Sequence, residues 1–129
     1  MKPICPFCNL NKADLIAEND LTVVIRDKHP ISSGHSLIVL KKHVESFFHT
    51  TDEEKLSLLK AIDQGKNLLD KKFKSDGYNI GINDGEAAGQ TINHLHIHLI
   101  PRYEGDSKDP RGGIRWIFPD KAPYWENNE

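Results

Sequence analysis

The stretch His94-Leu-His-Ile-His-Leu-Ile-Pro-Arg102 decides the fold, because imidazole and aliphatic side chains alternate along it. Successive side chains of a β-strand point to opposite faces, so the alternation predicts a strand with one histidine face and one apolar face. Neighbouring imidazoles would lie about 7 Å apart on that face. Histidine exchanges protons near neutral pH, binds metals and can act as a nucleophile. A merely solvated face would be served equally by threonine or lysine, so the histidines favour a functional one.

Two further features complete the expected fold. Thr51-Asp-Glu-Glu54 has the form of a capping box, which predicts a helix that runs from there to about Phe73. Apolar residues recur in it at near-helical spacing and should face the sheet: Leu58, Ile62, Leu69 and Phe73. Further strands are expected over residues 13–19, 21–27, 36–40 and 78–83. Strands that come as hairpin-like neighbours around one long helix favour an α+β domain with an antiparallel sheet.

The composition favours one soluble domain over residues 1–129. Hydrophobic residues make up 37% and charged residues 28%, and a net charge of −2 gives no electrostatic reason to expect a nucleic-acid or membrane partner. No apolar run is long enough to span a membrane, and Met1-Lys-Pro-Ile-Cys5 lacks the apolar core of a signal peptide. We therefore expect a cytoplasmic protein with a core over 1–103 and an aromatic tail over 104–129.

The cysteine pair Cys5-Pro-Phe-Cys8 has the two-residue gap that lets two thiolates reach one metal ion. A closed zinc site needs four ligands, so histidines must complete it. The candidates are His29, His35, His43, His49, His94, His96 and His98. Polar surroundings place His29 and His49 on the surface, whereas His35 is placed to orient a loop. A redox-active pair is the alternative, although its familiar context is a turn between a strand and a helix. A catalytic zinc on the three strand histidines would leave the cysteines unexplained.

The loop before the histidine strand carries small and polar residues. Gly85 and Gly89 let backbone amides approach a ligand, and successive amides can form an anion-binding nest. Thr91 adds a hydroxyl and Asn83 an amide. Beside three histidines, this loop favours a site in which phosphorus lies between imidazole and backbone donors, as phosphoryl or nucleotidyl transfer requires.

Three separated motifs resemble the histidine triad (HIT) family of nucleotide hydrolases and transferases. His94–Ile100 fits the family pattern His-Φ-His-Φ-His-Φ-Φ, where Φ is apolar. Upstream, Gly89-Gln-Thr91 also matches, as do Gly34-His-Ser-Leu-Ile-Val39 and Lys42-His43. The resemblance covers the chain from about Cys5 to Arg102.

This resemblance implies an HIT-like fold, with a five-stranded antiparallel sheet, one long helix and a short one, paired as a homodimer. It also implies that His96 attacks the α-phosphorus of a nucleotide and forms a covalent nucleotidyl intermediate that water then opens. A backbone carbonyl on the other ring nitrogen would fix the tautomer. His98 would bind a non-bridging or leaving-group oxygen. The other substrate-binding positions match Asp27 for the ribose, and Asn83, Gly89 and Thr91, with Gln90 beside them, for the phosphates.

In zinc-bearing members of that family, the metal is held by residues that match Cys5, Cys8, His43 and His94. The resemblance therefore implies a structural zinc without an open coordination position, and no catalytic cofactor. His94 would then anchor the strand that presents His96.

The implied substrates are diadenosine polyphosphates such as Ap4A, or adenosine phosphoramidates. Asn83 is typical of the phosphoramidase branch, whereas Pro101-Arg102 is more like the polyphosphate branch. A nucleotidylyltransferase or phosphorylase would use the same intermediate with phosphate as acceptor. The alternative to an enzyme is a nucleotide-binding protein with vestigial activity.

The tail around Arg111-Gly-Gly-Ile-Arg-Trp116 lies outside the shared motifs. Its arginines and tryptophan suit phosphate and base contacts, and we expect it in the pocket of a partner subunit.

Overall fold

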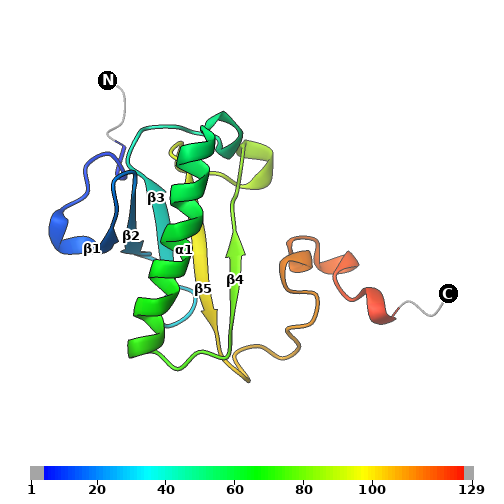
Figure 1. Cartoon of the computed structure of the whole chain (residues 1–129). Helices are drawn as coiled ribbons and strands as arrows, with labels where there is room; N and C mark the ends of the chain where they lie inside the picture. The colour runs from blue at the N-terminus through cyan, green and yellow to red at the C-terminus, as the bar shows by residue number, and fades with distance from the viewer. Residues whose placement is uncertain (1–4, 127–129) are drawn as a thin grey trace.

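The predicted strands form one antiparallel sheet in the computed structural model, which describes residues 5–126. The strands are β1 (Leu15–Glu18), β2 (Thr22–Arg26), β3 (Ser36–Leu40), β4 (Gly77–Gly81) and β5 (His96–Arg102). Their order across the sheet is β1-β2-β3-β5-β4, so β3 and β5 are interior strands and β4 is an edge (Figure 1). Residues 1–4, on which the expected lack of a leader partly depends, and residues 127–129 of the tail lie outside the described part.

Three strand boundaries differ from the predicted ones by two residues, and the others agree within one residue. A 3-10 helix over Lys12–Asp14 delays the start of β1. The predicted strand 78–83 ends at Gly81, where its pairing with β5 stops at His98. His94 and Leu95 precede β5, because the Leu95 amide bonds the Val44 carbonyl in the loop after β3, 2.7 Å away. The loop contact, rather than strand pairing, therefore sets the position of His94.

The helix α1 (Asp52–Lys72) begins at the predicted capping box. The Thr51 amide donates to Glu54 Oε1 at 2.8 Å, and the Glu54 amide donates to Thr51 Oγ1 at 3.1 Å. The buried positions recur every three or four residues and face the sheet: Glu54, Leu58, Ala61, Gly65 and Leu69. At Gly65 an added Cβ would lie 3.1 Å from Leu99 Cδ2, so the glycine lets the helix lie close on β5. The short helix that we expected beside α1 is instead a set of 3-10 helices of three to five residues.

The two faces of β5 separate apolar side chains from imidazoles, as the alternation predicted. Leu95, Ile97 and Leu99 are buried in the core against α1. The register pairs Val39 with His96 and Leu37 with His98, which places both histidines on the opposite face with a second apolar cluster. That cluster comprises Phe7, Val23, Ile25, Leu37 and Val39.

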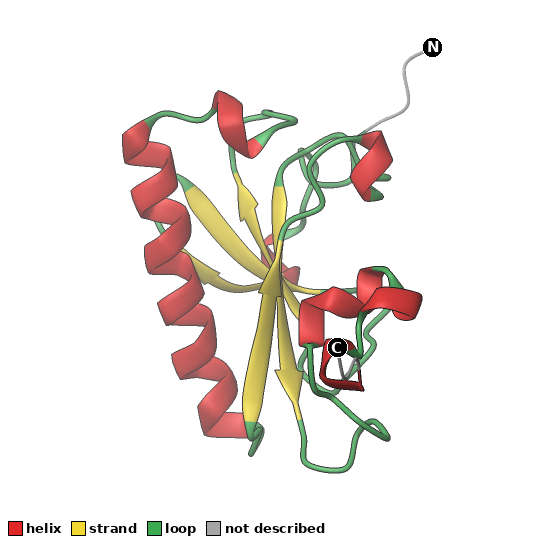
Figure 2. Cartoon of the chain, turned by 90° about the vertical axis from the view of Figure 1, so that its right-hand side faces the viewer, coloured by secondary structure: helices red, strands yellow, loops and turns green. Residues whose placement is uncertain are grey.

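The histidine face is flanked by the N-terminal segment and the C-terminal tail, whereas α1 lies on the other side of the sheet (Figure 2). Arg102 joins the tail to the sheet, because its guanidinium donates to Asn79 Oδ1 at 2.6 Å and to both carboxylate oxygens of Asp106 at 2.8 Å. This ion pair holds the pKa of Asp106 well below its usual range. Among the described helices, none has the length and apolar character needed to cross a bilayer.

The fully buried Leu69 on α1 provides a test of this packing. We expect Leu69→Ala to lower the free energy of unfolding by about 2–5 kcal/mol, because it opens a cavity between helix and sheet. Leu59 lies on the same helix but is 60% exposed, so Leu59→Ala should change that free energy by less than about 0.5 kcal/mol. Chemical denaturation measures both. Equal losses in the two variants would contradict the assignment of the buried face.

Candidate active site and metal cluster

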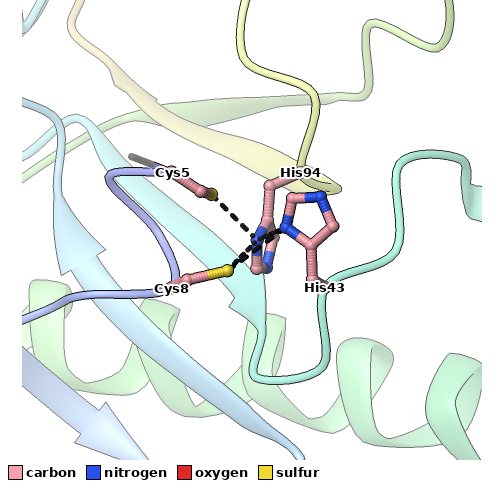
Figure 3. A group of neighbouring side chains, drawn as sticks. All are labelled: Cys5, Cys8, His43 and His94. Carbon is pink, nitrogen blue, oxygen red and sulfur yellow. Dashed lines mark hydrogen bonds between the residues drawn. The ribbon is translucent and has the colours of Figure 1, made fainter. Parts of the chain in front are cut away.

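Four side chains from distant parts of the chain converge at the start of β5: Cys5, Cys8, His43 and His94 (Figure 3). The Nδ1 atom of His94 lies 3.4 Å from Cys5 Sγ, 3.5 Å from Cys8 Sγ and 3.2 Å from His43 Nδ1. Cys8 Sγ is 3.2 Å from His43 Nδ1. Around one tetrahedral metal, with bonds of about 2.0–2.3 Å, neighbouring sulfur and nitrogen ligands lie roughly 3.3–3.8 Å apart. The cluster therefore has the dimensions of a four-ligand metal site.

The tautomer of His94 also fits a metal. Its Nε2 lies 2.6 Å from the Leu40 carbonyl oxygen, which can only accept, so Nε2 carries the proton and Nδ1 is bare. The bare nitrogen faces both thiols, and a hydrogen bond of this kind on the far ring nitrogen is the usual orienting contact of a metal-binding histidine. The four residues could thus hold a metal ion, in the combination expected from the sequence, with no position left for substrate.

His96 is held by the backbone of His94. The Nδ1 atom of His96 lies 2.8 Å from the His94 carbonyl oxygen, so Nδ1 donates and Nε2 keeps its lone pair. The side chain is only 9% exposed. Phe7 packs edge-on against this ring, with centroids 5.1 Å apart, and also against His94 at 5.8 Å. Sequence reasoning missed Phe7, although it lies between the two cysteines.

His98 belongs to a second cluster, with His35 and Asp27. His98 Nδ1 lies 3.0 Å from His35 Nε2, and Asp27 Oδ2 lies 3.4 Å from the same His35 nitrogen. Burial lowers the pKa of both histidines, and in His98 the neighbouring His96 and His35 lower it further. Both rings are therefore neutral at pH 7. From the sequence we expected His35 to orient a loop and also counted it among the possible zinc ligands. Its contact with His98 was not expected, and the sequence signal for it was the pair Gly34-His35 before β3.

The glycine loop before β5 has the open backbone that the sequence predicted. Gly85 and Gly89 both have positive φ, at 95° and 93°, and a short 3-10 helix (Glu86–Ala88) lies between them. Gln90 is buried, and its side-chain amide bonds the backbone of the loop itself: it accepts from Gly85 N at 2.8 Å and donates to Ile92 O at 3.1 Å. The same amide nitrogen also donates to Glu45 O in the loop after β3, at 2.9 Å. Its side chain therefore shapes the loop, and the substrate contact expected for Gln90 stays a prediction. Asn83 and Thr91 are exposed.

An open groove of about 1480 Å³ runs over the histidine face. Its lining contains every residue predicted to take part in catalysis or to bind substrate, from four separate segments: Asp27, Asn83, Gly89, Gln90, Thr91, His96 and His98. The metal cluster is not part of this lining, so it lies behind the groove rather than in it. From the tail, Ile114 and Trp116 line the same groove in the same chain. The expected contribution of the tail to a partner subunit stays a prediction.

Comparisons with known proteins agree with this architecture. The HIT domain family matches residues 9–105. An uncharacterized HIT-like protein of Methanocaldococcus jannaschii is 39% identical over 81% of this chain and 84% of its own length. The adenylylsulfatase HINT3 of Arabidopsis thaliana is 36% identical over 79% of this chain and 54% of its own length. The adenosine 5'-monophosphoramidase hnt1 of Schizosaccharomyces pombe is 30% identical over 76% of this chain and 74% of its own length.

Among solved structures, a Zn-bound histidine triad family protein from Mycobacterium smegmatis superposes with a TM-score of 0.67. It is 32% identical, over 74% of this chain and 69% of that one. The fold and the histidine face thus define a nucleotide-processing enzyme of the α+β class. The chain belongs to the HIT family.

The metal cluster can be tested with two histidines that are both exposed, His43 and His49. We expect the purified protein to contain about one metal ion per chain, and His43→Ala to lose it and to unfold at a lower temperature, because one of four ligands is removed. His49 is outside the cluster, so His49→Ala should keep both properties. Elemental analysis and thermal denaturation measure the effect. Full metal content in His43→Ala would contradict the ligand assignment.

Proposed function

We propose that this chain hydrolyses adenylyl compounds at the α-phosphorus through a covalent nucleotidyl-His96 intermediate, with diadenosine polyphosphates or adenosine phosphoramidates as substrates. The observation that carries the proposal is the bond from His96 Nδ1 to the His94 carbonyl at 2.8 Å, which leaves a bare Nε2 on a ring that lines the groove. A neutral imidazole with a free lone pair is a competent nucleophile at pH 7. The adenylylsulfatase and the phosphoramidase among the relatives support an adenylyl group as the shared part of the substrate.

The proposed reaction has two displacement steps. His96 Nε2 attacks the α-phosphorus and the bond from phosphorus to the leaving group breaks. His98 is proposed to bind the departing atom through a hydrogen bond, and the leaving group takes up its proton from solvent. Water then attacks the same phosphorus, gives up a proton to solvent, and expels His96 Nε2, so that the nucleoside monophosphate is released and the imidazole regains its lone pair. One difficult displacement is thereby split into two easier ones.

The groove offers donors and acceptors for the rest of a nucleotide. The open amides around Gly89, with the Thr91 hydroxyl and the Asn83 amide, are proposed to bond the phosphate oxygens, where they stabilise charge in the transition state. The Asp27 carboxylate at the end of β2 is proposed to accept from the ribose hydroxyls. One of its oxygens already accepts from His29 N at 2.8 Å, which fixes the direction of the carboxylate.

We propose zinc as the metal of the cluster, because two thiolates and two imidazoles are a donor set that zinc favours. Bound there, zinc would supply no chemistry to the substrate and would only hold the N-terminal segment against the start of β5. The thiol ligands suit a reducing compartment, which supports the cytoplasm as the place of action.

We also propose that the chain pairs with a second copy. This is supported by the free edge of β4, where Ile80 is 48% exposed and the neighbouring tail exposes Ile114.

The nucleophile can be tested by trapping the intermediate. Wild-type protein quenched during turnover of an adenosine phosphoramidate should carry an added adenylyl group on His96, as mapped by mass spectrometry. His96→Ala should lose at least about a thousandfold in kcat, because the covalent route is removed. It should still bind AMP, since the loop donors and Asp27 remain.

Four outcomes would contradict the proposal. Turnover by His96→Ala at the wild-type rate would refute the nucleophile, and so would an adenylyl group mapped to another residue. Formation of ADP instead of AMP when phosphate is added would show that phosphate, not water, resolves the intermediate. Micromolar binding without turnover of any adenylyl substrate would point to vestigial chemistry.

The tail is proposed to set the preference for the leaving group, since Trp116 lines the groove while the nearby Phe118 does not. Both aromatic side chains are exposed, at 41% and 69%. We expect Trp116→Ala to change the ratio of kcat/KM for a diadenosine polyphosphate to that for a phosphoramidate by about threefold to tenfold, the usual value of one stacking contact. Phe118→Ala should leave the ratio unchanged. Steady-state kinetics decide, and equal ratios in all three proteins would contradict a role for Trp116.

A further inference from the structure

The N-terminal segment, residues 5–11, is joined to the body of the protein by its side chains. Among the described residues, the backbone hydrogen bonds of this segment stay local: Cys8 N donates to Cys5 O at 3.2 Å, and Asn11 O accepts from Asp14 N at 3.0 Å. The polar contacts that reach other elements are those of the two cysteines with the histidines of the metal cluster. The segment is therefore held by the metal cluster and by apolar packing.

Phe7 provides most of that packing, and it lies between the two cysteines in the sequence. Its side chain is 9% exposed and belongs to the apolar cluster on the histidine face of the sheet. The ring meets two histidines edge-on: the His94 centroid is 5.8 Å away at an interplanar angle of 89°, and the His96 centroid is 5.1 Å away at 66°. One aromatic ring thus contacts both a residue of the metal cluster and the proposed nucleophile.

Phe7 also forms the boundary between the metal cluster and the groove. It lines the groove, as do its neighbours Pro6 and Asn9, whereas the four residues of the cluster do not. The strand β5 is held independently, because it pairs with β3 and β4 on its two sides and packs its apolar face on α1. A change at the cluster can therefore reach the groove by moving Phe7, while the sheet stays in place.

The ring of His96 needs restraint from more than one direction. The bond from its Nδ1 to the His94 carbonyl, 2.8 Å long, fixes one atom and leaves the ring able to swing about it. Phe7 contacts the ring from the side of His94, and His98 follows on the other side along the strand, with centroids 5.3 Å apart. A misplacement of about 1 Å can cost on the order of a hundredfold in rate. The direction of Nε2 therefore depends on Phe7 as well as on the carbonyl.

We propose that Phe7 is a positioning residue that couples the metal cluster to His96. This rests on the function proposed above. With metal bound, ligation of Cys5 and Cys8 on either side of Phe7 holds its ring against His96 and keeps Nε2 directed at the α-phosphorus. Without metal, the segment loses its polar anchor, the Phe7 ring leaves, and His96 becomes more exposed and less well directed. A metal that touches no substrate thereby controls the rate of the reaction.

The accessibility of His96 measures this coupling without turnover. Diethyl pyrocarbonate transfers an ethoxycarbonyl group to a bare imidazole nitrogen, and fragment-ion mass spectrometry locates the modified histidine. We expect removal of the metal from the wild type with a chelator to speed the modification of His96 at least about fivefold, because Phe7 no longer covers the ring. Metal-loaded Phe7→Ala should react as fast as the metal-free wild type, and removal of its metal should change that rate less than about twofold.

Turnover should move in the opposite direction. We expect metal-loaded Phe7→Ala to lower kcat for an adenosine phosphoramidate at least about tenfold, although its nucleophile is more exposed, because a misdirected ring reacts slowly. Phe7→Leu keeps a large apolar side chain and should recover most of both properties. Leu10 lies in the same segment and lines the same groove, so it provides a matched control. Leu10→Ala should keep the full response to metal, since Phe7 is left in place. Elemental analysis checks that the loaded variants carry as much metal as the wild type.

The outcomes are separable from those of the proposed function. If no adenylyl substrate were turned over, the proposed function would fail, while the modification of His96 would still test the coupling. An unchanged rate of modification after metal is removed from folded wild type would overturn the inference, and so would a response to metal in Phe7→Ala as large as in the wild type. If circular dichroism showed that the metal-free chain unfolds, the metal-loaded proteins decide: equal modification rates and equal kcat in Phe7→Ala and wild type would contradict a role for Phe7.

Discussion

The buried ring of His94 is the constraint on which the rest of the site depends. Its Nε2–H bonds the Leu40 carbonyl at the end of β3, its Nδ1 faces the two thiols and His43, and its backbone carbonyl holds His96. A ring that is 0% exposed cannot leave any of these groups to water, so each contact must be made within the protein. Movement of His94 would therefore disturb the metal cluster and the orientation of His96 together.

The two histidines that follow show how one strand can present two chemical states. Alternation along β5 places His96 and His98 on one face, and their rings lie 5.3 Å apart. Nothing in the strand itself makes them different. The difference comes from what lies behind each ring: a carbonyl that accepts from His96, and a histidine that faces His98. A carbonyl only accepts, and the backbone amide of Ile31, which only donates, bonds His35 Nδ1 at 3.2 Å. The positions of the protons on these neutral rings therefore follow from backbone groups.

The groove is built by segments that are far apart in the sequence. The N-terminal segment brings Phe7 against His96, the glycine loop supplies open backbone, and the tail brings Trp116 to the far side. Arg102 at the end of β5 holds the start of the tail through Asp106, so the strand that carries the histidines also positions the tail. The histidine face and the shape of the groove around it thus depend on different parts of the chain.

The sequence by itself determined the sheet, the long helix and the face of β5 that carries the histidines, because these follow from local periodicity and from the capping box at Thr51. The family resemblance further predicted the combination of Cys5, Cys8, His43 and His94, which the structure brings together in a cluster that could hold a metal ion. Only the tertiary structure brought His35 and Phe7 to the histidine face, since the contacts from His35 to His98 and from Phe7 to His96 join segments separated by 63 and 89 residues. It also decided which ring nitrogens carry protons, because a tautomer depends on partners in space that no local pattern contains.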